Sequence, residues 1–236
     1  MPAPPRPDAG LRAHVLVLAK EPLPGRVKTR LSPPLTDAQC AEVATACLSA
    51  TLAAVAETPG IARTLILDGR PGRWLPPGFS VLAQRGGPLG ERLAAAFADA
   101  HALAPLPLLL VGMDTPQLTP ELLGQAVDTL LTPGTDAVLG RAVDGGWWAL
   151  GLSEPLTGAF DEVPMSTEHA GQAQHDRLVV LGRSATPLPV LQDIDSAADL
   201  LAVSMLLPRT SPLRQLVHGF ALAGSMALPG PGVLTS

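Results

Sequence analysis

The stretch HVLVLAKEPLPGRVKTRL, residues 14–31, joins an apolar run to a loop rich in basic side chains. The leading run predicts a buried strand, and the prolines and glycine that follow end that strand. The loop holds Lys20 and Lys28, the only two lysines of the 236-residue chain, beside Arg26 and Arg30. A helical pattern comes next, so the stretch opens a strand–loop–helix unit of the kind that builds α/β folds.

Strand-like and helical patterns alternate along the rest of the chain, which is typical of βαβ units and a mainly parallel sheet. We expect strands at about 14–19, 64–68, 80–84, 107–114, 136–140 and 147–152. We expect helices at about 37–57 and 167–181, and one that opens at the turn RGGPLG and ends at about 102. Two further helices are expected to begin at 119–120 and at 196. Capping residues at Thr36, Thr119 and Ser196 support three of the helix starts. The sequence therefore predicts a three-layer α/β/α sandwich.

A single domain over residues 13–204 accounts for these elements, because no repeat or clear linker divides them. The Pro-rich start predicts a disordered lead over 1–12, and the Gly- and Pro-containing end predicts a surface-packed or disordered tail over 205–236. The first apolar run is too short for a signal peptide and ends on Lys20. Uncharged runs of membrane-spanning length are interrupted by prolines, so we expect no membrane span.

Charge and cysteine content narrow the possible functions. The net charge of −5 argues against nonspecific nucleic-acid binding, which needs a broad basic face. Cys40 and Cys47 lie seven residues apart on an expected helix, beyond the reach of a disulfide. We therefore expect reduced thiols and a cytoplasmic protein. The sequence does not indicate an oligomeric state.

The four cations of the basic loop repel one another unless solvent or a bound anion relieves them. Proline and glycine restrict the loop backbone, so its side chains converge with little entropy left to lose. A lysine ammonium suits a phosphate oxygen as a point charge, and an arginine offers a planar fork. The alternative is a solvated basic turn, and we favour phosphate binding. The loop is not a Walker A motif, because PLPGRVKTR lacks the earlier glycine of that motif.

Acidic side chains occur in two further loops. Asp114, in GMDTPQL, lies at the carboxyl end of an expected buried strand, where carboxylates commonly hold Mg²⁺ or Mn²⁺. A turn-forming aspartate before Thr-Pro is the alternative for this residue. Asp193 and Asp195 precede the cap at Ser196. Asp195 either favours the helix N-terminus electrostatically or is the second carboxylate on a metal.

Two glycine-rich loops complete the candidate site. AVDGGWWALG, 142–151, sets Asp144 before two glycines and two indoles, which a hairpin turn also explains. Strand alternation sends Trp147 and Trp148 to opposite faces, so we expect one in the core and one beside a crevice. QRGGPLGERL, 84–93, either brings backbone groups and Arg92 to an anionic ligand or is a plain loop before a helix. Ligands of open α/β sheets bind beyond the carboxyl ends of the strands, where these loops lie.

Taken in order, six segments resemble one family: AKEPLPGRVKTRL, LGERL, GMDTPQL, LGRAVDGGWWALGL, VPMST and DIDSAADL. Together they resemble the DUF2064 group of the GT-A glycosyltransferase-like superfamily over about residues 14–203. The VKTRL loop with its following helix is also similar to the phospholactate guanylyltransferases, which share the nucleotidyltransferase-type fold. The resemblance implies a single-domain GT-A-like fold with a site for a nucleotide or a nucleotide-sugar.

The resemblance also implies roles for single residues. Lys20, Arg26, Lys28 and Arg30 would meet the phosphates. Gln84 and Gly90 would lie near the base, and Asp114 and Asp195 would share a divalent metal, Mg²⁺ or Mn²⁺. The sugar or acceptor would be bordered by Asp144, Gly145, Gly146 and Trp147. The sequence departs from the family pattern on this acceptor side, at Arg141, Trp147, Trp148 and Met165.

These observations predict a metal-dependent transferase that uses a nucleotide-activated donor, an NDP-sugar, and a small-molecule acceptor. Lys28 and Asp114 would stabilise the diphosphate and its metal, and Asp144 would act as general base toward an acceptor hydroxyl. One alternative is nucleotidyl transfer from an NTP to a phosphorylated small molecule. Another is a nucleotide-binding protein without turnover.

Overall fold

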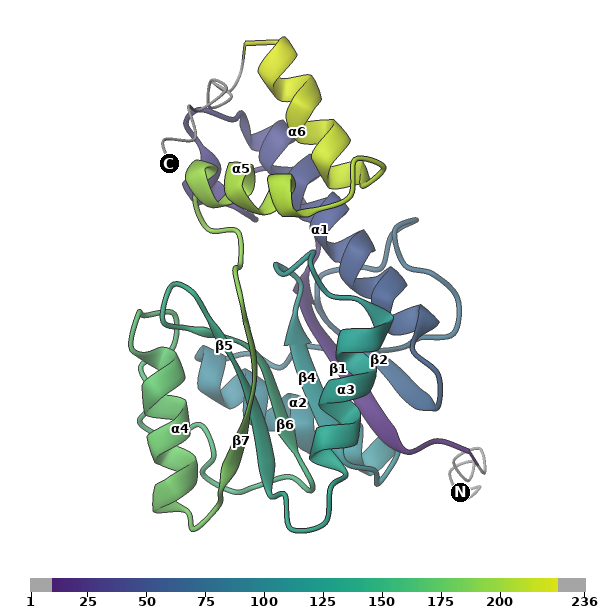
Figure 1. Ribbon diagram of the computed structural model, residues 1–236, viewed down its shortest axis with the longest axis vertical. Coiled ribbons are helices and arrows are strands. Elements are labelled where there is room, and N and C mark those ends of the chain that lie inside the picture. Colours follow the sequence, from purple (N-terminus) through teal and green to yellow (C-terminus); the bar gives the residue numbers. More distant parts are fainter. Residues whose placement is uncertain (1–9, 225–236) are drawn as a thin grey trace, which may run out of the picture.

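A seven-stranded sheet forms the centre of the computed structural model, which describes residues 10–224 (Figure 1). The strands are β1 (Ala13–Lys20), β2 (Ile61–Asp68), β3 (Ser80–Ala83), β4 (Leu108–Gly112), β5 (Ala137–Ala142), β6 (Trp147–Leu152) and β7 (Ala185–Leu191). Their order in the sheet is β3-β2-β1-β4-β6-β5-β7. β6 pairs antiparallel with β4 and β5, and the other described pairings are parallel, so the sheet is mainly parallel as predicted.

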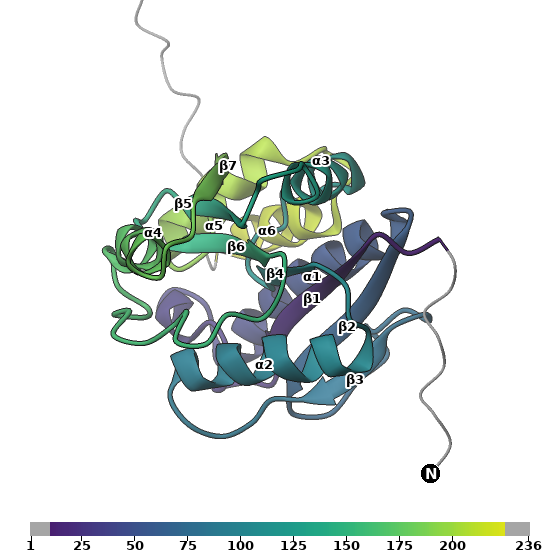
Figure 2. The same ribbon diagram turned by 90° about the horizontal axis from the view of Figure 1, so that it is seen from below.

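Helices cover both faces of the sheet and make the predicted three layers. They are η1 (Thr29–Leu31, a 3₁₀ turn), α1 (Asp37–Glu57), α2 (Leu89–Leu103), α3 (Pro120–Leu130), α4 (Ala170–Val180), α5 (Ala197–Leu206) and α6 (Pro212–Leu222). Val15 and Val17 of β1 share an apolar cluster with α1 and α3, whereas Leu16 shares another with α2 and α4. Figure 2 shows α2 and α3 on opposite sides of the sheet. Burial on both faces explains why β1 is a continuous apolar run.

A third apolar cluster lies beyond the carboxyl end of β1 and joins distant parts of the chain. α5 and α6 pack there on η1 and on the first half of α1 (Figure 1). Its buried members are Leu31, Leu35, Cys40, Val43, Cys47, Ile194, Leu200, Val203, Leu207, Leu213, Val217 and Phe220. The cluster holds the basic loop, which contains η1, against the segment that leads into α5. Both cysteines are buried and free, as expected.

Most expected elements are present with small changes in their bounds. The helix at 37–57 and the strand at 147–152 have the predicted limits. β7 is absent from the predicted set, because Pro187 and Pro189 argue against a strand. Its place at the edge of the sheet explains the difference. Two prolines two residues apart remove N–H groups from one side of a strand, and at an edge that side needs no partner.

The predicted tail at 205–236 contains a helix that the sequence analysis misses. α6 begins with Pro212 behind Ser211 and buries Leu213, Val217 and Phe220 in the third cluster. Described residues beyond 204 therefore contribute to the core of the α/β domain. Residues 225–236 of the predicted tail and residues 1–9 of the predicted lead lie outside the described residues.

α1 is the one helix in the described part of the chain that is long and apolar enough to cross a membrane by length and composition. Ten of its 21 residues are buried, and nine of these ten divide between the sheet-facing cluster and the third cluster. Burial on two sides accounts for the apolar composition, as in the core helix of a globular domain.

Candidate active site

The strand order reverses between β1 and β4, which lie side by side in the sheet. Loops that leave two such strands diverge and leave a crevice beyond their carboxyl ends. The basic loop follows β1, and Asp114 follows β4 two residues beyond Gly112. Two adjoining cavities open at this crevice, and Arg30, Asp114 and Asp195 border both. We call them the first and the second chamber.

The first chamber has a volume of about 400 Å³ and collects basic side chains. Its polar lining includes Lys20, Arg26, Lys28, Arg30, Gln84 and Arg92. The four loop cations therefore face one cavity, together with a fifth cation from α2. Such convergence suits a polyanionic ligand, because the repulsion among the cations is relieved when an anion binds.

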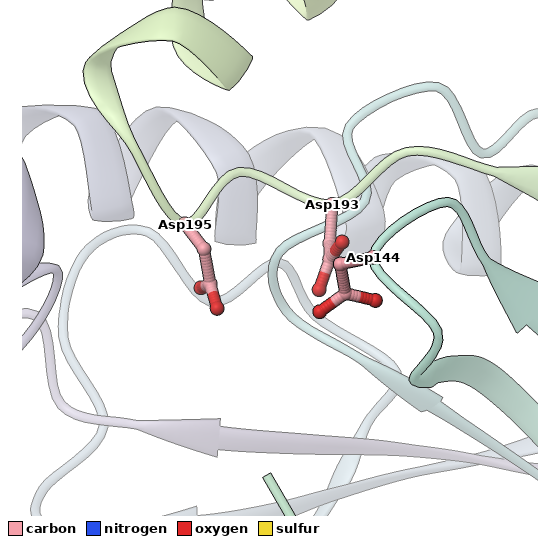
Figure 3. Close-up of side chains that lie close together, drawn as sticks. All are labelled: Asp144, Asp193 and Asp195. Atoms are coloured by element: carbon pink, nitrogen blue, oxygen red, sulfur yellow. The ribbon is translucent and has the colours of Figure 1, made fainter. Parts of the chain in front are cut away.

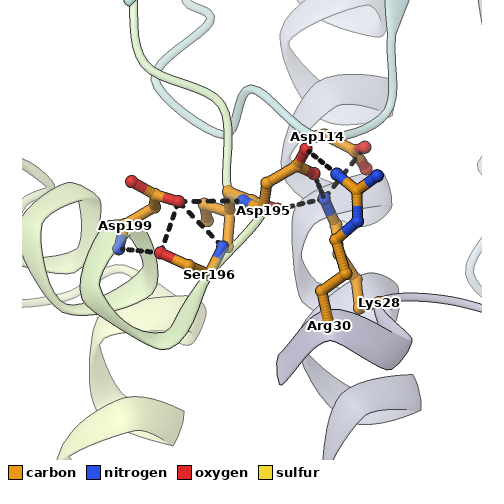
Figure 4. A network of polar contacts seen from close by, with 7 residues as sticks. Lys28, Arg30, Asp114, Asp195, Ser196 and Asp199 are labelled. Carbon is orange, nitrogen blue, oxygen red and sulfur yellow. Dashed lines mark hydrogen bonds and ion pairs between the residues drawn. The ribbon is translucent and has the colours of Figure 1, made fainter. Parts of the chain in front are cut away.

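Lys28 joins two carboxylates that come from opposite halves of the chain (Figure 4). Its Nζ lies 2.9 Å from Asp114 Oδ2 and 3.6 Å from Asp195 Oδ1. The same ammonium donates a hydrogen bond to the carbonyl oxygen of Ile194, and 6% of the side chain is exposed. Burial lowers the pKa of this ammonium, but the charge and hydrogen bond of Asp114, helped by Cys47 and Asp195, raise the pKa above its ordinary value. A charged lysine thus stands between the two acids that the sequence predicts as metal ligands.

The backbone of Lys28 is left-handed, with φ 50° and ψ 32°, where η1 begins. Ser166, which borders both chambers, has φ 62°. This conformation costs a residue with a side chain roughly 1–2 kcal/mol. Such strain persists where the surroundings fix the residue, and it is concentrated at ligand sites.

The side chain of Asp195 is available to the chambers because Ser196 and Asp199 form the capping box of α5. Asp199 Oδ2 accepts hydrogen bonds from the backbone N–H groups of Asp195, at 3.3 Å, and Ser196, at 2.8 Å (Figure 4). Asp195 itself faces Lys28 and also Arg30, whose Nη1 lies 3.0 Å from its Oδ2. The sequence leaves two roles open for Asp195, electrostatic support of the helix N-terminus or a metal-binding carboxylate, and in the structure Asp195 borders both chambers.

Gln84 and α2 build the other wall of the first chamber. Gln84 Nε2 donates to the carbonyl oxygens of Ala19, at 2.7 Å, and Ile66, at 3.2 Å, while its Oε1 accepts from Arg92 Nη1 at 2.9 Å. The amide therefore fixes Arg92 at the cavity. Gly90, which the resemblance sets near a base, lines neither chamber. An added Cβ there would lie 3.2 Å from a carbonyl oxygen of the loop before α4, so the glycine permits close backbone packing.

The second chamber has a volume of about 650 Å³ and collects acidic side chains. Asp144, Asp193 and Asp195 each place a carboxylate oxygen within 4.8 Å of the other two (Figure 3). Burial, followed by the charges of Asp144 and Asp195, raises the pKa of Asp193 to about 6. Closely spaced carboxylates are the donor set that Mg²⁺ and Mn²⁺ prefer, and a cation would relieve their repulsion.

The turn that carries Asp144 is packed directly on the segment before α4. A Cβ at Gly145 would lie 1.9 Å from the carbonyl oxygen of Glu168, and Gly145 has φ 90°. The backbone N–H of Gly171 donates to the carbonyl oxygen of Gly145 at 2.9 Å. Only glycine fits both the close approach and the backbone angle. The contact fixes Asp144 relative to residues 165–168, which form the far wall of the chamber.

The two neighbouring indoles of β6 lie in different surroundings, one beside a cavity and one in the core, as predicted. Trp147 lines the second chamber, whereas Trp148 is 2% exposed in the core. The Nε1 of Trp148 donates to the carbonyl oxygen of Pro189 at 2.9 Å and so ties β6 to the edge strand β7.

The predicted site residues meet from several loops, although not all of them border a cavity. Gly146 lines the second chamber, while Gly90 and Gly145 line neither and act through backbone packing. Sequence reasoning gave no role to Asp193 and Ser166. The D-x-D spacing was a signal for Asp193, but a left-handed serine leaves no signal in a sequence.

A model of the family "Uncharacterized protein conserved in bacteria (DUF2064)" matches residues 40–167. No curated protein sequence matches significantly. A crystal structure from Desulfovibrio desulfuricans G20, described provisionally as a nucleotide-diphospho-sugar transferase, has a TM-score of 0.81 and 24% identity. The alignment covers 90% of this chain and 96% of that one.

Two other solved structures are less similar to this chain. The 4-diphosphocytidyl-2C-methyl-D-erythritol synthase from Anaerococcus prevotii has a TM-score of 0.53 at 11% identity, over 84% of this chain and 96% of that one. CMP:2-keto-3-deoxy-manno-octonic acid synthetase, complexed with CTP, has a TM-score of 0.52 at 11% identity, over 83% and 98%. The chain therefore has the single-domain fold of the nucleotide-diphospho-sugar transferases, as the resemblance implies.

Proposed function

The chain belongs to the DUF2064 family, and from that premise we propose that it is a metal-dependent transferase acting on an NDP-sugar. The observation that carries the proposal is the meeting of two oppositely charged cavities at the reversal of strand order. The cationic first chamber fits a diphosphate. The acidic second chamber fits a metal and an acceptor hydroxyl.

Carboxylates of the second chamber are the residues that would hold the metal. Asp195 is the common member: the sequence pairs it with Asp114, and the structure sets it beside Asp144 and Asp193. These oxygen donors and their excess negative charge fit Mg²⁺ or Mn²⁺. When bound, such an ion supplies positive charge that stabilises the diphosphate as a leaving group.

The protein's own side chains would bind the donor and orient the acceptor through their positions and charges. Lys20, Arg26 and Lys28 would bind the phosphates, and Asp144 would orient the acceptor hydroxyl and take its proton. The hydroxyl oxygen would form a bond to the anomeric carbon of the sugar. The bond from that carbon to the nucleoside diphosphate would break, and the diphosphate would keep the electron pair. The protein would form no covalent bond of its own.

The proposal predicts that metal and NDP-sugar stabilise the protein together. Full-length protein should gain about 5–10 °C in Tm with Mn²⁺ and a UDP-, GDP- or dTDP-sugar at about 100 times Kd, since a ligand at that level adds about 2.7 kcal/mol. EDTA should remove the gain. No shift with any nucleotide or metal would contradict the proposal.

The second candidate is nucleotidyl transfer, because the same five cations would also bind a triphosphate. Free NTPs belong in the same thermal-shift series for this reason. Stabilisation by NTPs but not by NDP-sugars would favour nucleotidyl transfer. Nucleotide binding without product, followed by mass spectrometry over an acceptor panel, would favour a binding protein without turnover.

Metal affinity should depend on pH through Asp193. Its pKa of about 6 means that a proton occupies the carboxylate at pH 5 and is absent at pH 7.5. Metal ligands bind deprotonated, so Mn²⁺ should release about one proton at pH 5 and almost none at pH 7.5. Calorimetry in two buffers of different ionisation enthalpy measures this number. Asp193→Asn should abolish the release at pH 5, and release that persists in this variant would contradict the assignment.

The raised pKa of Asp193 also determines how the free energy of unfolding changes with pH when no metal is bound. The folded protein holds this proton up to about pH 6, whereas an unfolded aspartate loses it near its ordinary pKa of 3.8. The group therefore lowers the free energy of unfolding as pH rises through this window. A bound cation would reverse that effect.

A further inference from the structure

Some charged residues line only one of the two chambers, and these residues have opposite signs in the two chambers. Lys20, Arg26, Lys28 and Arg92 border the first chamber alone, and no acidic residue among the described ones does so. Asp144, Asp193 and Glu168 border the second chamber alone, and no cation in the described part of the chain does so. The shared border carries both signs. A ligand that spans the crevice therefore meets positive charge at one end and negative charge at the other.

The second chamber also has an apolar side. Leu89, Leu93, Leu110, Met165 and Trp147 line it. An indole and aliphatic side chains suit a ring with an apolar face, whereas the acids of the same cavity suit hydroxyl or ammonium groups. The lining thus combines an apolar wall with hydrogen-bond acceptors.

We propose that the acceptor is an uncharged or cationic hydroxyl compound with an apolar face, and that the second chamber excludes phosphorylated acceptors. The inference rests on the proposed function and names the substrate class of its acceptor side. Its basis is the placement of Asp144, Asp193 and Glu168 in a cavity that has no cation of its own.

A divalent ion would not reverse this selection. Asp144, Asp193, Asp195 and Glu168 all line the second chamber, and two positive charges would not balance four ionised carboxylates, so an acidic excess would persist. A phosphate on the acceptor would then lie near several carboxylates, with Arg30 of the shared border as the one cationic side chain among the described lining residues. Repulsion of this kind is a common way to reject a competing ligand.

Glu168 is the residue best suited to test the selection. Its side chain is 77% exposed at the border of the chamber, and its backbone is fixed by the contact with Gly145. Glu168→Lys reverses the charge there without removing a core contact. Glu57→Lys makes the same change at the exposed far end of α1 and is the matched control.

The test uses glucosamine, glucose and glucose 6-phosphate as acceptor probes, because they share a ring and differ in charge. Binding to full-length protein in MgCl₂ and UDP is followed by tryptophan fluorescence. Glucose 6-phosphate should bind at least about tenfold more weakly than glucose, and glucosamine at least as tightly as glucose. Glu168→Lys should lower the ratio of the Kd for glucose 6-phosphate to the Kd for glucose at least about threefold. Glu57→Lys should leave this ratio unchanged.

Several results would overturn the inference. They are equal or tighter binding of glucose 6-phosphate, no change in Glu168→Lys, and no binding of any probe to protein that binds UDP. Failure of UDP, GDP and dTDP alike to bind with Mg²⁺ would overturn the proposed function and this inference with it. UDP binding with a preference for the phosphorylated probe would overturn the inference alone.

Discussion

Replacing Lys28 with methionine should change the affinities for nucleotide and for metal in opposite directions. Lys28 borders the first chamber, so the loss of its ammonium should weaken nucleotide binding about 10- to 100-fold, the value of one charge-assisted hydrogen bond. The same ammonium stands between Asp114 and Asp195 and competes with any cation for their charge. Without it, Mn²⁺ should bind about three- to tenfold more tightly when no nucleotide is present.

The fold should survive the Lys28→Met change. Removing one partner of a buried ion pair costs about 3–5 kcal/mol when the other charge remains buried. Asp114 and Asp195 are 37% and 40% exposed, so water can solvate them, and a loss of about 1–2 kcal/mol is expected. Urea unfolding measures this loss.

Lys20→Met is the matched control, because Lys20 is the other lysine of the chain and borders the same chamber. It has no ion pair with either acid among the described contacts. Calorimetry should find weaker nucleotide binding and unchanged Mn²⁺ affinity in this variant. If Lys28→Met lowers the affinity for Mn²⁺, the ammonium is not a competing cation.

Asp195→Asn should have the largest effect on metal binding, with a loss of at least about 100-fold in Mn²⁺ affinity. Its carboxylate belongs to the group with Asp144 and Asp193 and is also the one that faces Lys28 and Arg30. The substitution keeps the shape of the side chain, and the capping box of α5 is formed by Ser196 and Asp199, so the helix should be unchanged. Electron paramagnetic resonance of Mn²⁺ measures the affinity.

Two further variants decide which carboxylate joins Asp195 in holding the metal. Asp193→Asn should share the loss, because the Asp193 and Asp195 oxygens lie within 4.8 Å of one another. Asp114→Asn should lose less, because the Asp114 carboxylate faces an ammonium 2.9 Å away. The opposite order would favour the Asp114–Asp195 pair that the sequence predicts. Undiminished Mn²⁺ binding in Asp195→Asn would exclude both arrangements.

Local sequence signals were enough to predict most of the fold. The cap at Thr36 and the apolar pattern behind it gave α1 its bounds, and the Asp-Gly-Gly turn gave the β5–β6 pair. β7 and α6 were not predicted, and the reason is the same for both. Each is stabilised by contacts with distant parts of the chain, which local sequence patterns do not show. Prolines are tolerated in β7 only at a sheet edge, and α6 is held by the third cluster.

The candidate site was predicted in its parts but not in its internal arrangement. The rule that ligands bind beyond strand ends was sufficient to bring the basic loop and Asp114 together. No periodic pattern relates residues as far apart as Lys28 and Asp195. The position of the ammonium between the two acids, and the approach of Asp193 to Asp144, therefore required coordinates.

The third apolar cluster has a consequence for where the smallest working unit of this chain ends. The matched family segment, 40–167, contains neither the cations that follow β1 nor Asp195. α5 and α6 pack on the flanking segments in the third cluster, and Pro212–Leu222 supplies Leu213, Val217 and Phe220 to the cluster that also buries Leu31 and Val43. The last helix of the described residues is thus a structural condition for assembling the basic loop that follows the first strand.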